Sequence, residues 1–241
     1  MRYGIFSDIH SNLQAMEAVL ESYLKENIDK YFCVGDIVGY AANPIECLDW
    51  VRKLNPVIVA GNHDWAVADL FDMEYFNPIA KQAVLWTKEV LGEKEKSFLG
   101  NLPMVFEDEN FSLVHGTLDN PQDFDYLTNE FIAKRTFAFM KNNLLFVGHT
   151  HVAGIFIEDG GSISYFEEES IKLTSNKRYI VNVGSIGQPR DGNPRPSFCI
   201  FDTNTKVLET RRINYNIQEA KKRIIEAGLP SYLAERLSIG H

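Results

Sequence analysis

The chain has 241 residues, of which 45% are hydrophobic and 24% charged, as is usual for a globular protein that folds in water. This length is sufficient to bury an apolar core without disulfide bonds, and we expect a single domain over residues 1–241. The formal net charge of −9 argues against a broad basic face, so long nucleic acid is not an expected partner.

The three cysteines, Cys33, Cys47 and Cys199, form no CxxC pair, and we expect buried, reduced thiols, which are typical of the cytoplasm. Near the N-terminus, Asp8 and His10 interrupt the apolar run that a signal peptide would need. No apolar stretch approaches the length of a membrane span. The sequence therefore predicts a cytoplasmic protein without membrane contact.

The first sixty residues alternate between strand and helix patterns. Short apolar runs predict strands, and apolar residues spaced by three or four predict helices. The predicted order is strand 2–7, helix 12–27, strand 30–34, helix 44–54 and strand 56–60. This order indicates a parallel sheet with crossover helices, in which ligands bind beyond the carboxyl ends of the strands.

The later part of the chain is predominantly β. Residues 64–101 have a less regular helical pattern, clearest at 81–91 and 94–99, and the polar, turn-rich residues 118–129 predict a surface loop. Further strands are predicted at 104–107, 111–114, 144–147, 153–157, 162–167, 179–183, 197–201 and 206–214. Further helices are predicted at 130–142, 216–227 and 230–237.

Five of the six histidines directly follow one of these apolar runs. In the stretch LLFVGHTH, residues 144–151, Gly148 ends a short run, and His149 and His151 follow with one residue between them. Neutral imidazole is the commonest metal ligand in proteins, and a rigid strand end gives such a ligand a fixed position. The candidate residues at strand ends are Asp8, His10, Asp36, Asn62, His63, Asp64, His115, His149 and His151.

This set of side chains favours a centre with two transition-metal ions. Carboxylates combined with several imidazoles suit Mn²⁺, Fe²⁺ or Zn²⁺ rather than Ca²⁺ or Mg²⁺, which favour oxygen ligands. The candidates are too many for one tetrahedral zinc ion and reasonable for two metals. Such pairs of metals drive hydrolysis at phosphorus and of some peptide bonds.

The order of the motifs resembles that of the calcineurin-like metallophosphoesterases. The motifs are Asp8-x-His10, Gly35-Asp36-x-x-Gly39, Gly61-Asn62-His63-Asp64, His115-Gly116 and Gly148-His149-x-His151. The segment NVGSIGQPR, residues 182–190, is similar to small bacterial and archaeal members, which include phosphodiesterases and relatives of diadenosine tetraphosphatase. The resemblance implies an α/β fold, a four-layer α/β/β/α sandwich of two mixed β-sheets flanked by helices, with the metals at one end of both sheets.

The resemblance also assigns roles to individual residues. It places one metal on Asp8, His10, Asp36 and His151, and the other on Asp36, Asn62, His115 and His149, so that Asp36 bridges. It makes His63 a proton donor that Asp64 orients. We expect two divalent transition-metal ions, with manganese favoured and iron, zinc or nickel as alternatives.

The expected reaction is hydrolysis of a phosphate ester. A water between two metals loses a proton near neutral pH and becomes a nucleophile, while a general acid protonates the leaving alkoxide. Phosphodiesters are favoured, because the segments 118–129 and 184–196 contain no dense basic clamp for a dianion. Phosphomonoesterase, protein phosphatase and dinucleoside polyphosphate hydrolase stay open as alternatives, and a non-catalytic scaffold on the same fold is a remote one.

Three residues are candidates for contact with the substrate, namely Asn62, Asn182 and Arg190. For Arg190 an alternative is equally open, in which it pairs with a surface carboxylate, because many such pairs are simply solvated. The expected partner is a small phosphate ester such as a nucleotide, and the oligomeric state stays open.

Overall fold

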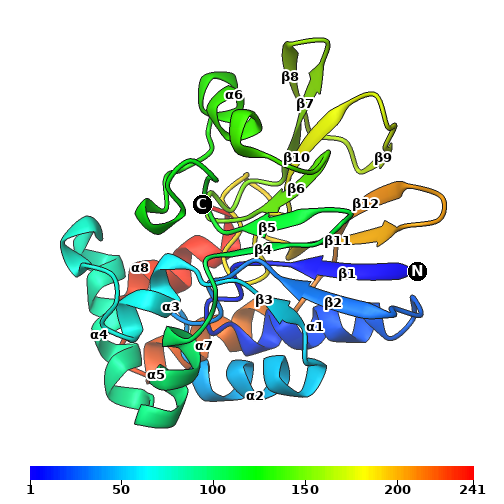
Figure 1. The fold of residues 1–241 in the computed structure, drawn as a ribbon. Coiled ribbons are helices and arrows are strands. Elements are labelled where there is room, and N and C mark those ends of the chain that lie inside the picture. Colours follow the sequence, from blue (N-terminus) through cyan, green and yellow to red (C-terminus); the bar gives the residue numbers. More distant parts are fainter.

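The computed structural model describes all residues, 1–241, and contains two six-stranded sheets (Figure 1). The first has the order β3 (Val57–Ile58), β2 (Lys30–Cys33), β1 (Arg2–Phe6), β11 (Ser197–Asp202), β12 (Val207–Arg212) and β9 (Ser170–Lys172). The second has the order β4 (Val105–Glu107), β5 (Ser112–Val114), β6 (Leu144–Val147), β10 (Arg178–Asn182), β7 (Gly154–Asp159) and β8 (Ser162–Phe166).

Both sheets are mixed. The predicted parallel arrangement is present in β1, β2 and β3, and β5, β6 and β10 are parallel to one another. The other pairs are antiparallel, including β1 with β11, which joins the two halves of the chain in one sheet. The carboxyl ends of β1, β2, β5 and β6 therefore lie at the same end of the molecule, on the left in Figure 1.

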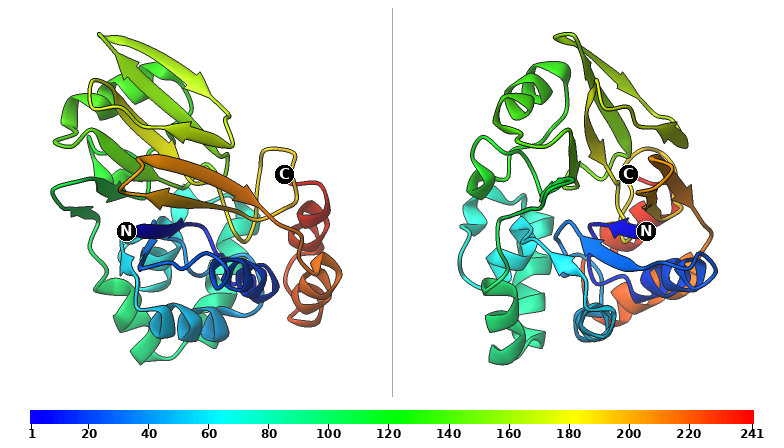
Figure 2. Two further views of the ribbon diagram at one scale, coloured as in Figure 1. Left: turned by 90° about the vertical axis from the view of Figure 1, so that its right-hand side faces the viewer. Right: turned by 45° about the vertical axis from the view of Figure 1, so that its right-hand side comes forward.

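Helices cover the outer faces of both sheets (Figure 2). The outer face of the first sheet carries α1 (Leu13–Tyr23), α2 (Pro44–Leu54) and α7 (Ile217–Glu226), and that of the second carries α6 (Glu130–Phe139). Near the carboxyl ends of the strands lie α3 (Asn62–Val67), η1 (Met73–Tyr75), α4 (Pro78–Val90), α5 (Glu93–Gly100), η2 (Pro121–Asp123), α8 (Ser231–Glu235) and η3 (Arg236–Ser238).

Successive side chains of each strand point to opposite faces of its sheet. Apolar residues therefore pack in three layers, one between the two sheets and one on the outer face of each sheet. In β1, Ile5 packs with Phe111 and Phe146 between the two sheets, while Phe6 packs with the α1 residue Met16 on the other face. A further cluster joins Phe137 of α6 to the second sheet. This period of two in the strands builds a four-layer α/β/β/α sandwich, and the predicted fold class is confirmed.

The differences from the sequence predictions are local. The strand β9 was not predicted, because its three residues form an edge strand through pairing with β12 and show no apolar run of their own. The first helix ends at Tyr23 instead of continuing to Asn27, which has a positive φ of 50°. The three cysteines are free and buried, as expected. No helix combines the length and apolar character that crossing a membrane requires.

Candidate functional site

The polar residues that follow the strands converge at one end of the two sheets. Asp8 and His10 follow β1, and Asp36 follows β2. The second sheet contributes His115 after β5, and His149 and His151 after β6. These six side chains and those of Asn62, His63 and Asp64 are all buried. A sequence pattern spread over 144 residues thus becomes one compact group of titratable side chains.

The distances within this group suit shared coordination of cations. Asp8 Oδ1 lies 3.1 Å from His151 Nε2 and 3.5 Å from His10 Nε2. Asp36 Oδ2 lies 3.5 Å from His10 Nε2 and 3.3 Å from His115 Nε2. Three sets of three residues have all their ligand atoms within 4.8 Å of one another. The first set is Asp8 with His10 and His151, the second is Asp36 with His115 and His149, and the third is Asp36 with His10 and His63. Each of the first two sets contains three of the four residues in one of the groups that the sequence resemblance implies; Asp36 is absent from the first set and Asn62 from the second.

Backbone carbonyls orient three of the imidazoles. The Nδ1 atoms of His10, His115 and His151 lie 3.0, 2.6 and 2.5 Å from the carbonyl oxygens of Val38, Val34 and Gln188. A carbonyl can only accept, so each Nδ1 carries a proton and donates it. In the neutral form of each ring the lone pair of Nε2 is then directed at the centre, which is the usual arrangement of histidine ligands.

Several acceptor atoms in the centre have no hydrogen-bond partner. They are Asp8 Oδ1, Asn62 Oδ1 and His115 Nε2, all buried. Buried polar atoms without partners cost free energy, and cations bound at the centre would supply the missing partners. The donor set therefore fits divalent metal ions on chemical grounds.

The backbone at these residues is strained. Asp8, His10, Asp36, His149 and His151 have positive φ values of 53°, 48°, 53°, 66° and 61°. Residues other than glycine rarely adopt this conformation, and such strain persists where the surroundings impose it, often at functional sites. The strand ends therefore turn sharply to direct these side chains into one place.

The shifted pKa values of most side chains in this group favour the protonation states in which they can bind cations. Burial alone would raise the pKa of Asp8, but the neighbouring His151 and His115 hold it well below its usual value. Burial, followed by the charges of neighbouring groups, lowers the pKa of His149 and of His151 to about 3. Burial would also lower the pKa of His115, yet Asp36 and Asp8 raise it to about 9. Binding of a cation at His115 must therefore release a proton.

His63 occupies the first turn of α3, beside the proposed ligands. Its backbone N–H donates to Asp36 Oδ1 at 2.9 Å, and its ring centroid lies 4.4 Å from that of Tyr40 and 4.8 Å from that of Phe76. The ring atom Nδ1 is buried without a partner. A Cβ at Gly39, which has a φ of 95°, would lie 2.4 Å from this nitrogen, so only glycine leaves room for the ring.

Asp64 has a different role from the predicted one. Its Oδ1 accepts from the amides of Ile37 and Val38 at 2.9 and 3.3 Å, and its Oδ2 accepts from the amide of Gly61 at 3.2 Å. The prediction that this carboxylate orients the His63 ring is therefore wrong. Asp64 instead ties the segment after β2, which contains Asp36, to the start of α3.

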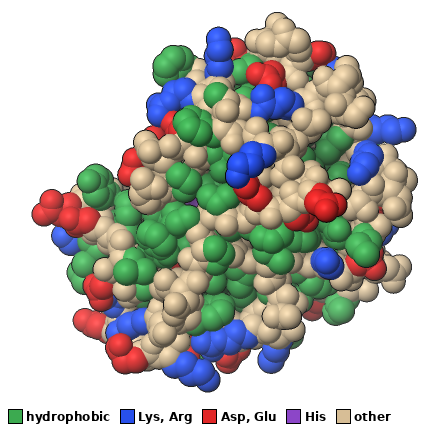
Figure 3. Space-filling model, viewed as in Figure 1, with side chains coloured by type: hydrophobic (Ala, Val, Ile, Leu, Met, Phe, Trp, Pro, Cys, Tyr) green, Lys and Arg blue, Asp and Glu red, His purple; other side chains and the backbone are tan.

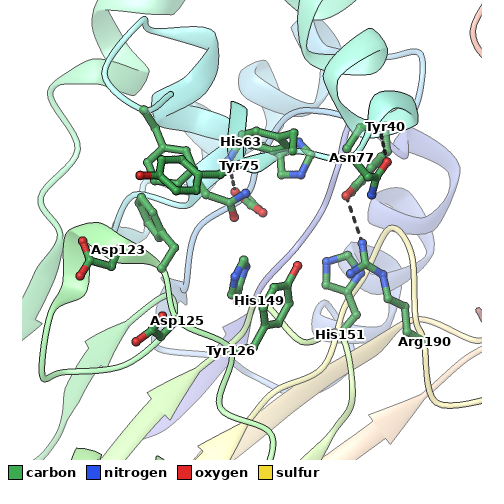
Figure 4. A pocket seen from close by; sticks show the side chains of 16 residues that line it. Tyr40, His63, Tyr75, Asn77, Asp123, Asp125, Tyr126, His149, His151 and Arg190 are labelled. Atoms are coloured by element: carbon green, nitrogen blue, oxygen red, sulfur yellow. Dashed lines mark hydrogen bonds between the residues drawn. The ribbon is translucent and has the colours of Figure 1, made fainter. Parts of the chain in front are cut away.

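A cavity of about 240 Å³ opens beside the group of histidines (Figure 4). Arg190 lines it next to His151 and has no carboxylate partner; its Nη2 donates to Tyr40 Oη at 3.2 Å and to Gln188 Oε1 at 2.9 Å. This excludes the alternative of a surface ion pair in this structure. Asp123 and Asp125 lie on the opposite side of the cavity.

Asn182 does not reach this cavity. Its Nδ2 donates to the carbonyl of Gly148 and to Thr150 Oγ1, both at 2.8 Å, and its Oδ1 accepts from the amide of Gly184. The prediction that Asn182 contacts phosphate is therefore wrong, because its polar atoms are used within the protein. They hold the turn between His149 and His151.

Aromatic residues around the cavity were missed in the sequence. Tyr126 stacks on His149 with 4.0 Å between ring centroids, and Phe71, Tyr75 and Phe76 line the other wall. The only indication of these residues in the sequence is that large aromatic side chains occur in otherwise polar loops. Figure 3 shows hydrophobic side chains gathered on this face of the molecule.

We expect Asn182→Ala to lower the free energy of unfolding of the metal-free protein by about 1–3 kcal/mol, because the buried Gly148 carbonyl loses one of its two donors and the amide of Gly184 loses its acceptor. Urea denaturation measures this change. Asn143→Ala is the matched control, since exposed Asn143 donates only to the Ser175 carbonyl, and its effect is expected within about 0.5 kcal/mol. Equal effects of the two substitutions would contradict the anchoring role of Asn182.

Comparisons with known proteins agree with this geometry. The model of the calcineurin-like phosphoesterase superfamily domain matches residues 1–206. An uncharacterized protein, MJ0912 of Methanocaldococcus jannaschii, is 39% identical over 241 residues, 98% of this chain and 97% of that protein. Phosphodiesterase YfcE of Escherichia coli is 27% identical over 225 residues, 89% of this chain and 93% of that protein. A metallophosphoesterase structure from Sphaerobacter thermophilus has a TM-score of 0.89 at 38% identity, covering 100% of this chain and 99% of that one. The chain belongs to the calcineurin-like phosphoesterase superfamily.

Proposed function

We propose that the protein is a phosphodiesterase of small molecules that uses two divalent cations, with manganese favoured. One observation carries the proposal. Buried carboxylates, imidazoles and an amide from both sheets, three of them with unpartnered acceptor atoms, converge beside a cavity that also contains His63 and Arg190. The Escherichia coli relative is named a phosphodiesterase, which supports the same reaction.

The proposed ligands divide into two groups that share Asp36. One cation would be held by Asp8, His10, Asp36 and His151, and the other by Asp36, Asn62, His115 and His149. Asp36 Oδ2 lies within 3.5 Å of a histidine from each group, which supports a bridging role. When bound, two such cations supply a water-derived nucleophile near neutral pH and neutralise charge on the phosphoryl oxygens.

His63 and Arg190 would act on the substrate. The His63 ring, which lines the cavity, would protonate the leaving alkoxide. The Arg190 guanidinium, with its Nη1 not used in any hydrogen bond, would bind phosphoryl oxygens. Two tyrosines at the cavity, Tyr75 and Tyr126, are 80% and 47% exposed, and such rings can stack on a nucleobase. This supports a nucleotide as substrate.

We expect a higher kcat/KM for bis-p-nitrophenyl phosphate than for p-nitrophenyl phosphate in the presence of Mn²⁺. A diester carries one negative charge, and the cavity offers one arginine opposed by Asp123 and Asp125. A monoester dianion would need more cationic groups. Release of p-nitrophenolate measures both rates.

Treatment with a chelator is expected to abolish both activities, and Mn²⁺ to restore them. Activity that survives complete removal of metal would overturn the metal-dependent mechanism. Faster hydrolysis of the monoester would leave the metal centre in place and overturn only the preference for diesters.

A further inference from the structure

A second cavity, of about 540 Å³, adjoins the candidate metal pocket on the side of Arg190. The two cavities share Tyr40, Asn77, Tyr126 and Arg190. The outer part of the second cavity is formed by the start of α4 and by the C-terminal residues Tyr232 and Arg236. These two residues lie beyond residues 1–206, which the family model matches.

The charge of this cavity is opposite to that of the protein as a whole. Its lining contains two arginines and no aspartate or glutamate, although the chain has a net charge of −9. Most other arginines of the chain pair with carboxylate side chains, as Arg178 does with Glu158 and Arg212 with Asp191. Neither Arg190 nor Arg236 hydrogen-bonds to a carboxylate side chain, and the hydrogen-bond partner of Arg236 is a main-chain oxygen of His241, the last residue of the sequence.

Contacts within the protein fix the position of both guanidinium groups, and each group keeps N–H donors that make no hydrogen bond. Arg190 lies over the ring of Tyr40 at 5.6 Å and donates through Nε and Nη2 to Gln188 Oε1, so its Nη1 is unused. Arg236 lies over the ring of Tyr232 at 5.3 Å and donates through Nε to the backbone oxygen of His241. Its Nη1 and Nη2 make no hydrogen bond within the protein.

We propose that Arg236 binds a second phosphate group of the substrate, carried on the part of the molecule that is not the leaving group, and that Arg190, whose Nη1 has two N–H donors, contacts both this phosphate and the scissile one. Arginine presents a planar set of donors that matches phosphate oxygens. Burial, and then the charge of Arg190, lower the pKa of Arg236, so the two cations repel each other until an anion enters between them.

The inference rests on the proposed function and narrows its substrate class. Because Arg190 lines both cavities, one molecule can place its scissile phosphodiester at the metal centre and a phosphomonoester in the second cavity. The substrate is then a diester with an additional terminal phosphate, such as a nucleoside bisphosphate ester.

Two esters that differ only in this group test the proposal. They are thymidine 5′-(p-nitrophenyl phosphate) and the same compound with a 3′-phosphate, measured with the manganese-loaded protein. We expect kcat/KM to be about 10–100-fold higher for the ester with the 3′-phosphate, the range for hydrogen bonds to charged groups. Arg236→Gln should bring this ratio of the two kcat/KM values close to one. Arg236→Lys should give an intermediate ratio, since lysine keeps the charge without the planar donors.

Arg223→Gln is the matched control. It removes the same charge from α7, where Arg223 pairs with Glu219 outside the cavity, and it should leave the ratio unchanged. A ratio near one in the wild type, or equal losses on both esters in Arg236→Gln, would overturn the proposal.

Calorimetric titration provides a readout that does not require activity. Thymidine 3′,5′-bisphosphate should bind about 10-fold or more tightly than thymidine 5′-phosphate, and Arg236→Gln should remove the difference. Inorganic phosphate that binds as tightly as the bisphosphate would indicate a site for free phosphate and overturn the assignment to substrate. If no ester is hydrolysed but the difference in binding persists, the proposed function fails while the second phosphate site stands.

Discussion

The substitution His63→Ala is expected to lower kcat by about 10²–10⁴-fold for phosphate esters with poor leaving groups, the range for loss of a general acid. Both metal ions and the fold should be retained. His63 Nδ1 is buried without a hydrogen-bond partner, and the backbone N–H of this residue, which donates to Asp36, is not removed by the substitution. The loss should therefore fall on the chemical step.

The protonation state of His63 supports a role that depends on bound substrate. Burial lowers the pKa of His63 well below its usual value, although Asp36 acts in the opposite direction. The free ring is therefore neutral at neutral pH. An anionic phosphate beside the ring favours its charged form, so the proton becomes available when the substrate is bound.

A comparison of leaving groups separates this role from others. An aryl ester such as bis-p-nitrophenyl phosphate needs little protonation of its leaving group, so its kcat should fall less in His63→Ala than that of an alkyl ester. His241→Ala, which removes the exposed C-terminal histidine, is the control and should leave both rates unchanged. Equal losses on both esters with metals retained would mean that His63 orients phosphate. Loss of a metal would make it a ligand, as its proximity to His10 and Asp36 allows.

The fold class and the residues of the centre were predictable because both depend on local patterns. Most candidate ligands lie within a few residues of the end of a short buried strand, so one pattern of apolar residues indicates both the strand and the place of the ligand. Asp8 after β1 and His149 after β6 are examples. The convergence of these ends follows from parallel pairing, which the order of strands and helices implies.

The direction of individual polar side chains was not predictable in the same way. Asn182 faces the Gly148 carbonyl because β10 pairs with β6 in a register that places Asn182 opposite Val147, and this pairing joins distant parts of the chain. For Asp64 a signal did exist. It is the third residue of α3, where an acidic side chain commonly accepts from the amide of the N-cap residue.

The walls of the cavities depend on tertiary contacts alone. Tyr75, Tyr126 and Arg236 come from short helical turns and loops that show no apolar period. The C-terminal residues reach Arg190 because the cluster that contains Leu233 and Leu237 packs on α4 and α7. No pattern within residues 230–241 indicates that this segment borders the site.

Asp36→Asn is expected to weaken the binding of both metal ions together. Asp36 Oδ2 lies 3.5 Å from His10 Nε2 and 3.3 Å from His115 Nε2, so one oxygen lies between the two proposed ligand groups. Asparagine has the same shape, and its Oδ1 can still accept from the backbone N–H of His63, so the fold should persist. Loss of an outer-shell partner alone weakens metal binding about 10–100-fold, and we expect the loss of a charged direct ligand to exceed this at each site.

Calorimetric titration with Mn²⁺ and elemental analysis test this expectation. The wild type should bind two ions per chain, and at most one ion would contradict the two-metal centre itself. His115→Ala is the comparison, because His115 belongs to one ligand group only and its loss should affect mainly one ion. Loss of the same single ion in both variants would show that Asp36 serves one metal and does not bridge.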